Sequence, residues 1–278
     1  LSYLSYIFFA KPVVAGEQEK AETIAGSGRS VEVLVFLGLI ATLFLVFIFF
    51  QVTYLFGGDT NIVNAGFTYA EYARRGFWEL LVVAMLSLLI LLAGEKYAGV
   101  ESKKDNKFMI PALVLIAEVI IVIVSAFKRL SLYIDAYGMT ELRFYVAGFI
   151  ILLLILFVLL AIKFYKSKPE QFFAFGTLLT AAGFLIMVNV INPDSFIVKA
   201  NIEQYNKTGK LDVTYVGMLS ADAEADKIKL YNKLDGDNKM ILRSYLLNEK
   251  DLLNEYTKDW QSYNFSREKA RKLMGDVK

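Results

Sequence analysis

The chain has 278 residues, 56% of them hydrophobic and 21% charged, and its mean hydropathy of +0.47 is rare among soluble globular proteins. It has no cysteine and no histidine, which excludes disulfide bonds, thiol nucleophiles, histidine-containing triads, and zinc or haem sites built on these residues. Its 30 basic and 28 acidic residues give a net charge of +2, so we expect no nucleic-acid partner.

Residues 1–30 precede the first long apolar run. Residues 1–9 are apolar, but a bilayer-spanning helix needs about 20 residues. They also lack the basic region and cleavage site of a signal peptide. We therefore expect residues 1–30 to be the end of an upstream helix and a loop, in a fragment of a longer membrane protein.

Five segments are long and apolar enough to cross a bilayer. They are residues 33–50, 76–94, 108–127, 144–161 and 172–191. Glu79 and Glu118 are the only charged residues within these segments. Runs this poor in charge predict an all-α fold, a polytopic membrane bundle of about five transmembrane helices over residues 31–191, with the lipid bilayer as its surroundings.

The loops between these spans differ in positive charge. The N-terminal segment and the 95–107 and 162–170 loops carry 10 basic residues, whereas the 57–75 and 128–143 loops carry 5. Because basic loops are retained in the cytoplasm, we expect the first set inside and the second set outside. Five spans then place the C-terminal region outside the cytoplasm.

The first outer segment, residues 67–79, concentrates charge and aromatic rings. On a helix, Glu71, Arg75 and Glu79 stand four residues apart and Arg75 can pair with both carboxylates. Arg74 and Trp78 have the same spacing, which suits stacking of the guanidinium on the indole. An interfacial helix with an aromatic belt and snorkelling arginines explains the same pattern, so both interpretations stay open.

The second outer segment, residues 128–143, contains helix-end signals. Gly138 is a typical helix stop, and Thr140 is a typical N-cap for the fourth span. The side chains that capping leaves unexplained form a polar, aromatic cluster: Arg129, Tyr133, Asp135 and Tyr137.

Two further polar residues fall within spans. Glu118 is central in the third span, where an ionisable residue is either functional or a neutral, hydrogen-bonded packing residue. Asn189 lies near the end of the fifth span, and we expect a buried amide that needs a partner. After it, Asn192, Pro193 and Asp194 predict the start of a helix that runs to about residue 207 and ends at Gly209.

Residues 192–278 differ in composition, with 15 basic and 14 acidic residues in 87 positions. This change predicts a separate soluble tail domain of short helices. Beyond Gly209 the expected helices are residues 212–219, 222–234, 237–247, 250–256 and 266–274. A helical cap on the membrane face and a partner-binding domain are both compatible with this pattern.

The outer polar residues suggest a binding site. The candidate binding residues are Glu71, Arg74, Arg75, Arg129, Asp135 and Asn189, with Trp78, Glu79, Glu118, Tyr133 and Tyr137 in support. Carboxylates next to arginines are held ionised, which favours ion pairing or anion binding over catalysis. An ion-pair network that only fixes helix ends explains the residues equally well.

We therefore predict a non-enzymatic membrane protein that binds or senses a polar or anionic partner, such as a lipid head group, at its extracytoplasmic face. We expect neither a cofactor nor a metal ion. The alternative is a membrane enzyme or transporter that uses Glu71 or Asp135 as base or ligand, or Glu118 as a proton carrier. The sequence does not indicate an oligomeric state.

Several strings resemble a known family. Residues 69–77, 137–143, 192–194 with 201–202, 219–223 and 260–267 are similar to uncharacterised bacterial membrane proteins grouped as domain of unknown function 4173. The resemblance covers residues 66–274 and implies a multi-pass protein of the bacterial cytoplasmic membrane with further spans upstream. It implies no reaction.

Overall fold

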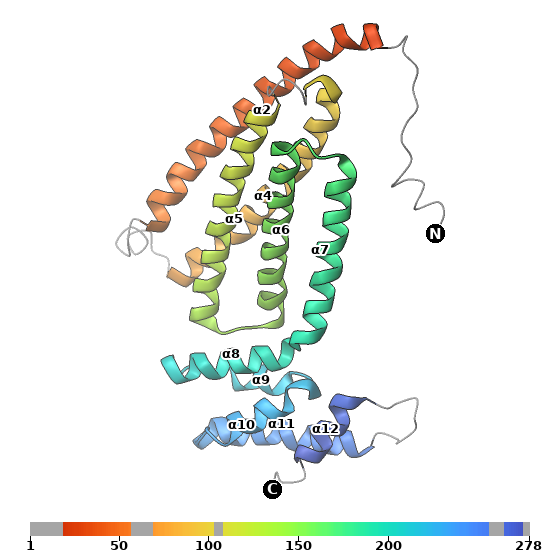
Figure 1. The fold of residues 1–278 in the computed structure, drawn as a ribbon. Coiled ribbons are helices and arrows are strands. Elements are labelled where there is room, and N and C mark those ends of the chain that lie inside the picture. The colour runs from red at the N-terminus through yellow and green to blue at the C-terminus, as the bar shows by residue number, and fades with distance from the viewer. Residues whose placement is uncertain (1–18, 57–68, 103–107, 256–263, 275–278) are drawn as a thin grey trace. The chain divides into compact units, whose positions relative to one another are not determined.

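The computed structural model describes residues 19–56, 69–102, 108–255 and 264–274, and in these ranges every regular element is a helix (Figure 1). The predicted all-α class is confirmed. The contacts divide the chain into two compact units. One comprises Leu1–Leu130 with Phe149–Gly183, and the other comprises Ser131–Gly148 with Phe184–Lys278.

Five of the described helices are long and apolar enough to span a membrane. They are α2 (Glu19–Phe56), α4 (Tyr69–Ser102), α5 (Met109–Tyr137), α6 (Glu141–Tyr165) and α7 (Glu170–Ile191). These match the five predicted spans, and each helix extends beyond its apolar run. The chain is therefore a multi-pass membrane protein in contact with lipid.

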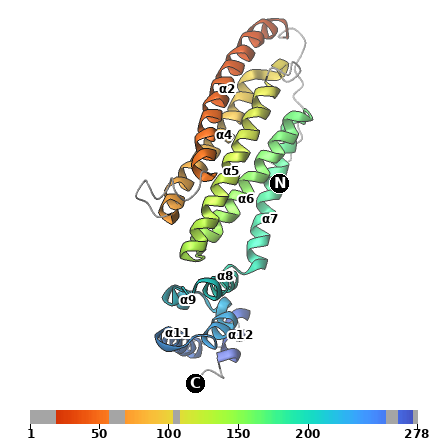
Figure 2. The same cartoon turned by 90° about the vertical axis from the view of Figure 1, so that its left-hand side faces the viewer.

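The first unit is built by helix packing typical of membrane bundles. Helices α2 and α4 lie side by side in both views (Figures 1 and 2). On α5, Leu115, Val119 and Val122 recur every three or four residues and are buried, which forms the packed face of that helix. Exposed leucines such as Leu39 and Leu43 suit a lipid environment, because lipid tails are as apolar as leucine.

The second unit contains the C-terminal helices. They are α8 (Pro193–Thr208), α9 (Val213–Met218), a 3-10 turn η1 (Ala221–Ala223), α10 (Glu224–Tyr231), α11 (Gly236–Glu255) and α12 (Phe265–Met274). A core that includes Ile197, Val216, Leu230, Leu242 and Leu246 holds them together, and all of these side chains are at most 1% exposed.

One predicted break in this unit is wrong. Residues 237–247 and 250–256 were expected to be two helices, yet α11 continues without interruption from Gly236 to Glu255. The intervening residues 248 and 249 are neither glycine nor proline. Leu246 and Leu253, seven residues apart, lie on the same buried face, so burial favours one continuous helix.

The start of α8 agrees with its sequence signal. Asn192 adopts a left-handed conformation with φ of 54°, and its side chain accepts a hydrogen bond from the Ser195 amide at 3.2 Å. Pro193 occupies the first turn, and the chain changes direction between α7 and α8 here (Figure 1). At the other end, the Gly209 amide donates to the Tyr205 carbonyl at 2.8 Å, as expected for a glycine cap.

Candidate functional site

The turn between α5 and α6 follows from two residues. Gly138 has φ of 83°, and its amide donates to the Ile134 carbonyl at 2.8 Å, which ends α5. The Thr140 hydroxyl accepts a hydrogen bond from the Arg143 amide at 3.4 Å at the start of α6. Both predicted caps are confirmed. A Cβ at Gly138 would stand 2.5 Å from Asn201 Oδ1, so only glycine fits this turn.

Arg143 closes the end of α5 from the far side of the turn. Its Nη1 donates to the Tyr137 carbonyl at 3.1 Å and also to the Gly138 carbonyl. Its guanidinium carbon lies 4.1 Å from the centre of the Tyr133 ring, and the Tyr133 and Tyr137 rings meet edge to face at 5.2 Å. The arginine that contacts Tyr133 is thus Arg143, which was not among the residues predicted for the polar, aromatic cluster.

Helix α8 holds this turn through two amide side chains. Asn201, only 5% exposed, accepts from the Met139 amide at 3.0 Å and donates to the Met139 carbonyl at 2.8 Å. Gln204 donates to the Asp135 carbonyl at 2.8 Å. The Tyr215 hydroxyl of α9 accepts from the Glu141 amide at 2.7 Å. Within the second unit, the α5–α6 turn, α8 and α9 therefore form one hydrogen-bonded assembly, which we call the turn clamp.

A cavity of about 440 Å³ adjoins the turn clamp. Its lining comes from the end of α5, from α8, from the α8–α9 connection, from the start of α9 and from α11: Ala136, Tyr137, Asn201, Gln204, Lys210, Leu211, Asp212, Val213, Thr214, Asn238 and Ile241. The side chains of Tyr137, Lys210, Thr214 and Asn238 make no hydrogen bond with another described residue, so their polar groups are free to meet a ligand.

The other predicted residues of this region fall in different units and differ in exposure. The carboxylate of Asp135 is on an exposed residue, whereas Arg129 is buried at 5% exposure in the first unit. Asn189 is exposed, and its amide donates to the Leu185 carbonyl at 2.8 Å, one turn earlier on α7. The expectation of a buried amide at Asn189 is therefore wrong, because a side chain-to-backbone bond within the helix satisfies it.

The first outer segment is only partly described. Helix α4 begins at Tyr69, so residues 69–79 are helical as predicted, but the side chains of Glu71, Arg74 and Arg75 lie outside the described residues. Trp78 is 45% exposed and its ring lies 4.6 Å from that of Phe77, and Glu79 is also exposed. The proposed pairing and stacking of the two arginines stay predictions.

Two buried carboxylates lie in the membrane unit. Glu118 is 4% exposed, and neither of its carboxylate oxygens has a hydrogen-bond partner among the described residues. Glu95 of α4 instead forms a buried ion pair with Lys163 of α6, whose side chains are 6% and 3% exposed. The pair was not predicted because both residues were expected in loops between spans, whereas α4 and α6 extend past them.

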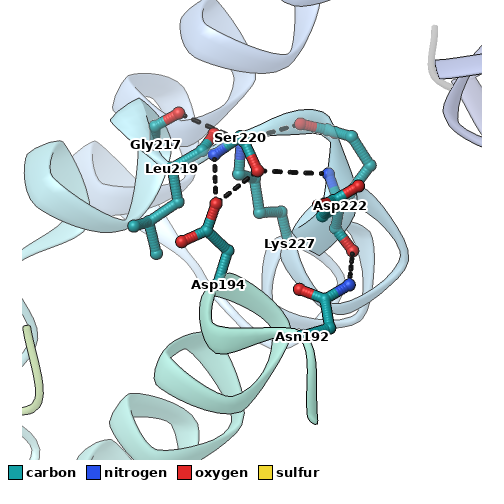
Figure 3. A network of polar contacts seen from close by, with 8 residues as sticks. Asn192, Asp194, Gly217, Leu219, Ser220, Asp222 and Lys227 are labelled. Carbon is teal, nitrogen blue, oxygen red and sulfur yellow. Dashed lines mark hydrogen bonds and ion pairs between the residues drawn. The ribbon is translucent and has the colours of Figure 1, made fainter. Parts of the chain in front are cut away.

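A second polar network joins the starts of α8 and α10 (Figure 3). Asn192 donates to the Asp222 carbonyl at 3.2 Å, and Asp194 accepts from the Ser220 amide at 3.1 Å and from its hydroxyl. Lys227, 1% exposed, donates to the Glu224 carboxylate at 2.7 Å, to the Gly217 carbonyl at 3.2 Å and to the Leu219 carbonyl. Hydrogen bonds therefore join residues 192–194 to residues 219–223, which gives both segments a structural role.

Comparison with models of known protein families shows which family the chain belongs to. Residues 1–229 match a family model described as a domain of unknown function (DUF4153). The chain belongs to the DUF4153 family. The predicted resemblance to domain of unknown function 4173 is therefore wrong. The strings that suggested it, such as residues 137–143 and 192–194, are capping sequences, and capping recurs wherever helices end.

Membership in DUF4153 supports an integral membrane protein and no particular activity. Comparison with curated proteins and with solved structures finds no match. Among the described residues, no group of three aspartates or glutamates is placed to hold a metal ion.

Proposed function

We propose that this DUF4153 protein binds a polar or anionic partner in the cavity next to the turn clamp, and that binding alters the adjoining ends of α5 and α6. The observation that carries the proposal is the lining of the cavity. Tyr137 comes from a membrane-spanning helix, while Thr214 and Asn238 come from the C-terminal helices and Lys210 from the connection between α8 and α9. A ligand that contacts all four side chains would connect the end of α5 with the C-terminal region of this unit.

The chemistry of the cavity suits a polar ligand. Its volume of about 440 Å³ lies within the usual range for small-molecule pockets. A hydroxyl, an ammonium, a second hydroxyl and an amide provide donors and acceptors that no described residue uses. Asp212 is already used as the cap of α9, because its carboxylate accepts from the Tyr215 amide at 2.9 Å. Lys210 is then the charged group that can select an acidic partner.

The turn clamp provides the route to the membrane helices. Asn201 and Gln204 line the cavity and also hold the backbone of Met139 and Asp135. A ligand that orders these two amides would therefore rigidify the α5–α6 turn. Rigidification of this kind can transmit a binding event without a large displacement.

The test uses the full chain in detergent micelles, with glycerol phosphate and an N-acetylated amino-sugar disaccharide as probes. A probe that binds should raise the thermal midpoint, by an amount equivalent to about 2.7 kcal/mol at 100 times its Kd. It should also slow hydrogen exchange in the first turn of α6. Ile241→Trp places an indole in the cavity and should abolish both effects.

Met240→Trp is the matched control, since residue 240 is 65% exposed and does not line the cavity. Tyr215→Phe separates binding from transmission, because it removes the acceptor for the Glu141 amide but leaves the cavity lining intact. It should bind the probe with less slowing of exchange in α6. Equal binding by the Ile241→Trp and Met240→Trp variants would contradict the proposal.

We also propose that the C-terminal unit lies outside the cytoplasm, on the evidence of the basic residues in the loops. A reporter enzyme that is active only outside the cytoplasm, fused after Lys278, should be active. An inactive reporter alongside an active cytoplasmic reporter would reverse this orientation.

A second function, proton-coupled transport, is favoured by Glu118 alone. A buried carboxylate without a hydrogen-bond partner among the described residues is costly in a membrane unless it is neutral or exchanges a proton. If it carries protons, Glu118→Gln should abolish proton flux in proteoliposomes and leave the thermal midpoint unchanged. Wild-type proteoliposomes without flux above that of empty vesicles would remove this candidate.

A further inference from the structure

A second cavity, of about 460 Å³, lies on another face of α8. Its lining consists of Lys199, Ile202, Asp226, Lys229, Asn232 and Lys233. It shares no lining residue with the cavity of the proposed function. We call it the lysine groove.

The groove is lined by three lysines and one carboxylate, and two of the lysines pair with that carboxylate. Asp226, 5% exposed, accepts from the Ser195 hydroxyl at 2.6 Å and pairs with Lys229 at 2.9 Å and Lys199 at 3.6 Å. Burial alone raises the pKa of the Asp226 carboxyl, but the bonds from Ser195 and Lys229 and the nearby charges hold it below its usual value. The carboxylate therefore stays ionised and fixes two ammonium groups, and the lining keeps an excess of two positive charges.

The lining of the groove includes hydrogen-bond donors at and after the end of α10, on Lys229, Asn232 and Lys233. The amides of Asn232 and Lys233 bond to the carbonyls of Ile228 and Leu230, so the turn after α10 continues its helical path. Lys229, Asn232 and Lys233 then share one face, at offsets of three and four residues. Lys233 is exposed and pairs with no carboxylate among the described residues. Ammonium groups and an amide donor are suited to the oxygens of a phosphate ester.

The position of α8 indicates the source of the phosphate. Helix α8 starts two residues after the end of α7 and turns away from it at Asn192 (Figures 1 and 2). Lys199 is six residues beyond Pro193, so at 1.5 Å per residue it lies at most about 9 Å from the start of α8, whatever the direction of that helix. Lipid head groups occupy roughly 5–8 Å beyond each side of the hydrocarbon core. We propose that the lysine groove binds the phosphate of an anionic membrane lipid.

The experiment titrates the full chain in micelles with dihexanoyl phosphatidylglycerol, and with dihexanoyl phosphatidylcholine as the zwitterionic comparison. The wild type should prefer the anionic lipid. The triple variant Lys199→Gln, Lys229→Gln, Lys233→Gln should bind it about 125-fold more weakly, because each lysine near an anionic head group is worth about a factor of five. The matched control removes the same charge from exposed lysines elsewhere in the unit: Lys207→Gln, Lys269→Gln, Lys272→Gln.

The single variant Lys233→Glu tests the site without removing a partner of the buried Asp226, so a folding defect in the triple variant cannot account for its effect. It changes the charge by two units and should also weaken binding about 25-fold. Equal affinities of the two triple variants, or a Lys233→Glu variant that binds like the wild type, would overturn the site. Glycerol phosphate that binds the wild type as tightly as the lipid does, and binds the groove triple variant more weakly, would overturn the membrane source and identify a soluble phosphate ester as the ligand of the groove.

Discussion

Replacing Lys227 with methionine is expected to lower the free energy of unfolding of the C-terminal unit by about 3–5 kcal/mol. The ammonium group is 1% exposed and donates to the Glu224 carboxylate and to the carbonyls of Gly217 and Leu219 (Figure 3). Methionine fills a similar volume but donates no hydrogen bond. Its introduction leaves Glu224, also 1% exposed, as a buried charge without its cation.

The effect of this variant should depend on pH. Burial raises the pKa of the Glu224 carboxyl, while Lys227 opposes the rise, so the pKa is higher still without the lysine. Above the usual carboxyl range, the unfolded chain releases a proton that the folded variant retains. Stability of the variant should therefore fall as the pH rises, and the loss relative to wild type should shrink in acid.

Thermal and denaturant unfolding of the full chain, with hydrogen exchange in α10, measure this loss. Lys207→Met is the matched control, because it removes the same charge from a side chain that is 69% exposed and pairs with an equally exposed carboxylate. The double variant Glu224→Gln, Lys227→Met should recover part of the stability, since it removes the uncompensated charge. A Lys227→Met variant as stable as Lys207→Met at neutral pH would show that the buried pair contributes little.

The spans and caps could be predicted because the physics that sets them is local. Length and hydropathy identify a membrane helix irrespective of its neighbours, as with residues 144–161 in α6. Gly138, Asn192 and Gly209 indicate helix ends because each adopts a positive φ, and the capping hydrogen bonds around each residue join it to neighbours within four positions. These predictions need no knowledge of tertiary contacts.

The candidate site could not be predicted in the same way, because its contacts join residues far apart in sequence. Asn201 meets Met139 across 62 positions, and Gln204 meets Asp135 across 69. On a helix of mixed polarity, a clamp residue such as Asn201 has no pattern that distinguishes it from a solvated amide. Arg143 is one of the basic residues of the predicted 128–143 loop, but its role could not be predicted because it depends on the turn that places Tyr133 next to it.

Replacing Lys163 with methionine is expected to destabilise the membrane unit by about 3–5 kcal/mol. The ion pair with Glu95 connects α4 to α6, and both side chains are at most 6% exposed. The Lys163 ammonium also lies 5.8 Å from the ring centres of Phe164 and Phe173, where cation–π attraction adds to the pair. A buried carboxylate that loses an ion-pair partner has little water nearby to replace that interaction.

The measurement is the thermal midpoint of the full chain in micelles, with Lys166→Met as the control because residue 166 is exposed in the turn after α6. The double variant Glu95→Leu, Lys163→Met replaces both charges with apolar groups and should regain most of the loss, or exceed the wild type, since a buried pair gains little over a hydrophobic contact. If the double variant is instead no more stable than Lys163→Met, the cost comes from lost lysine packing against the two phenylalanines and not from the charge that Glu95 retains.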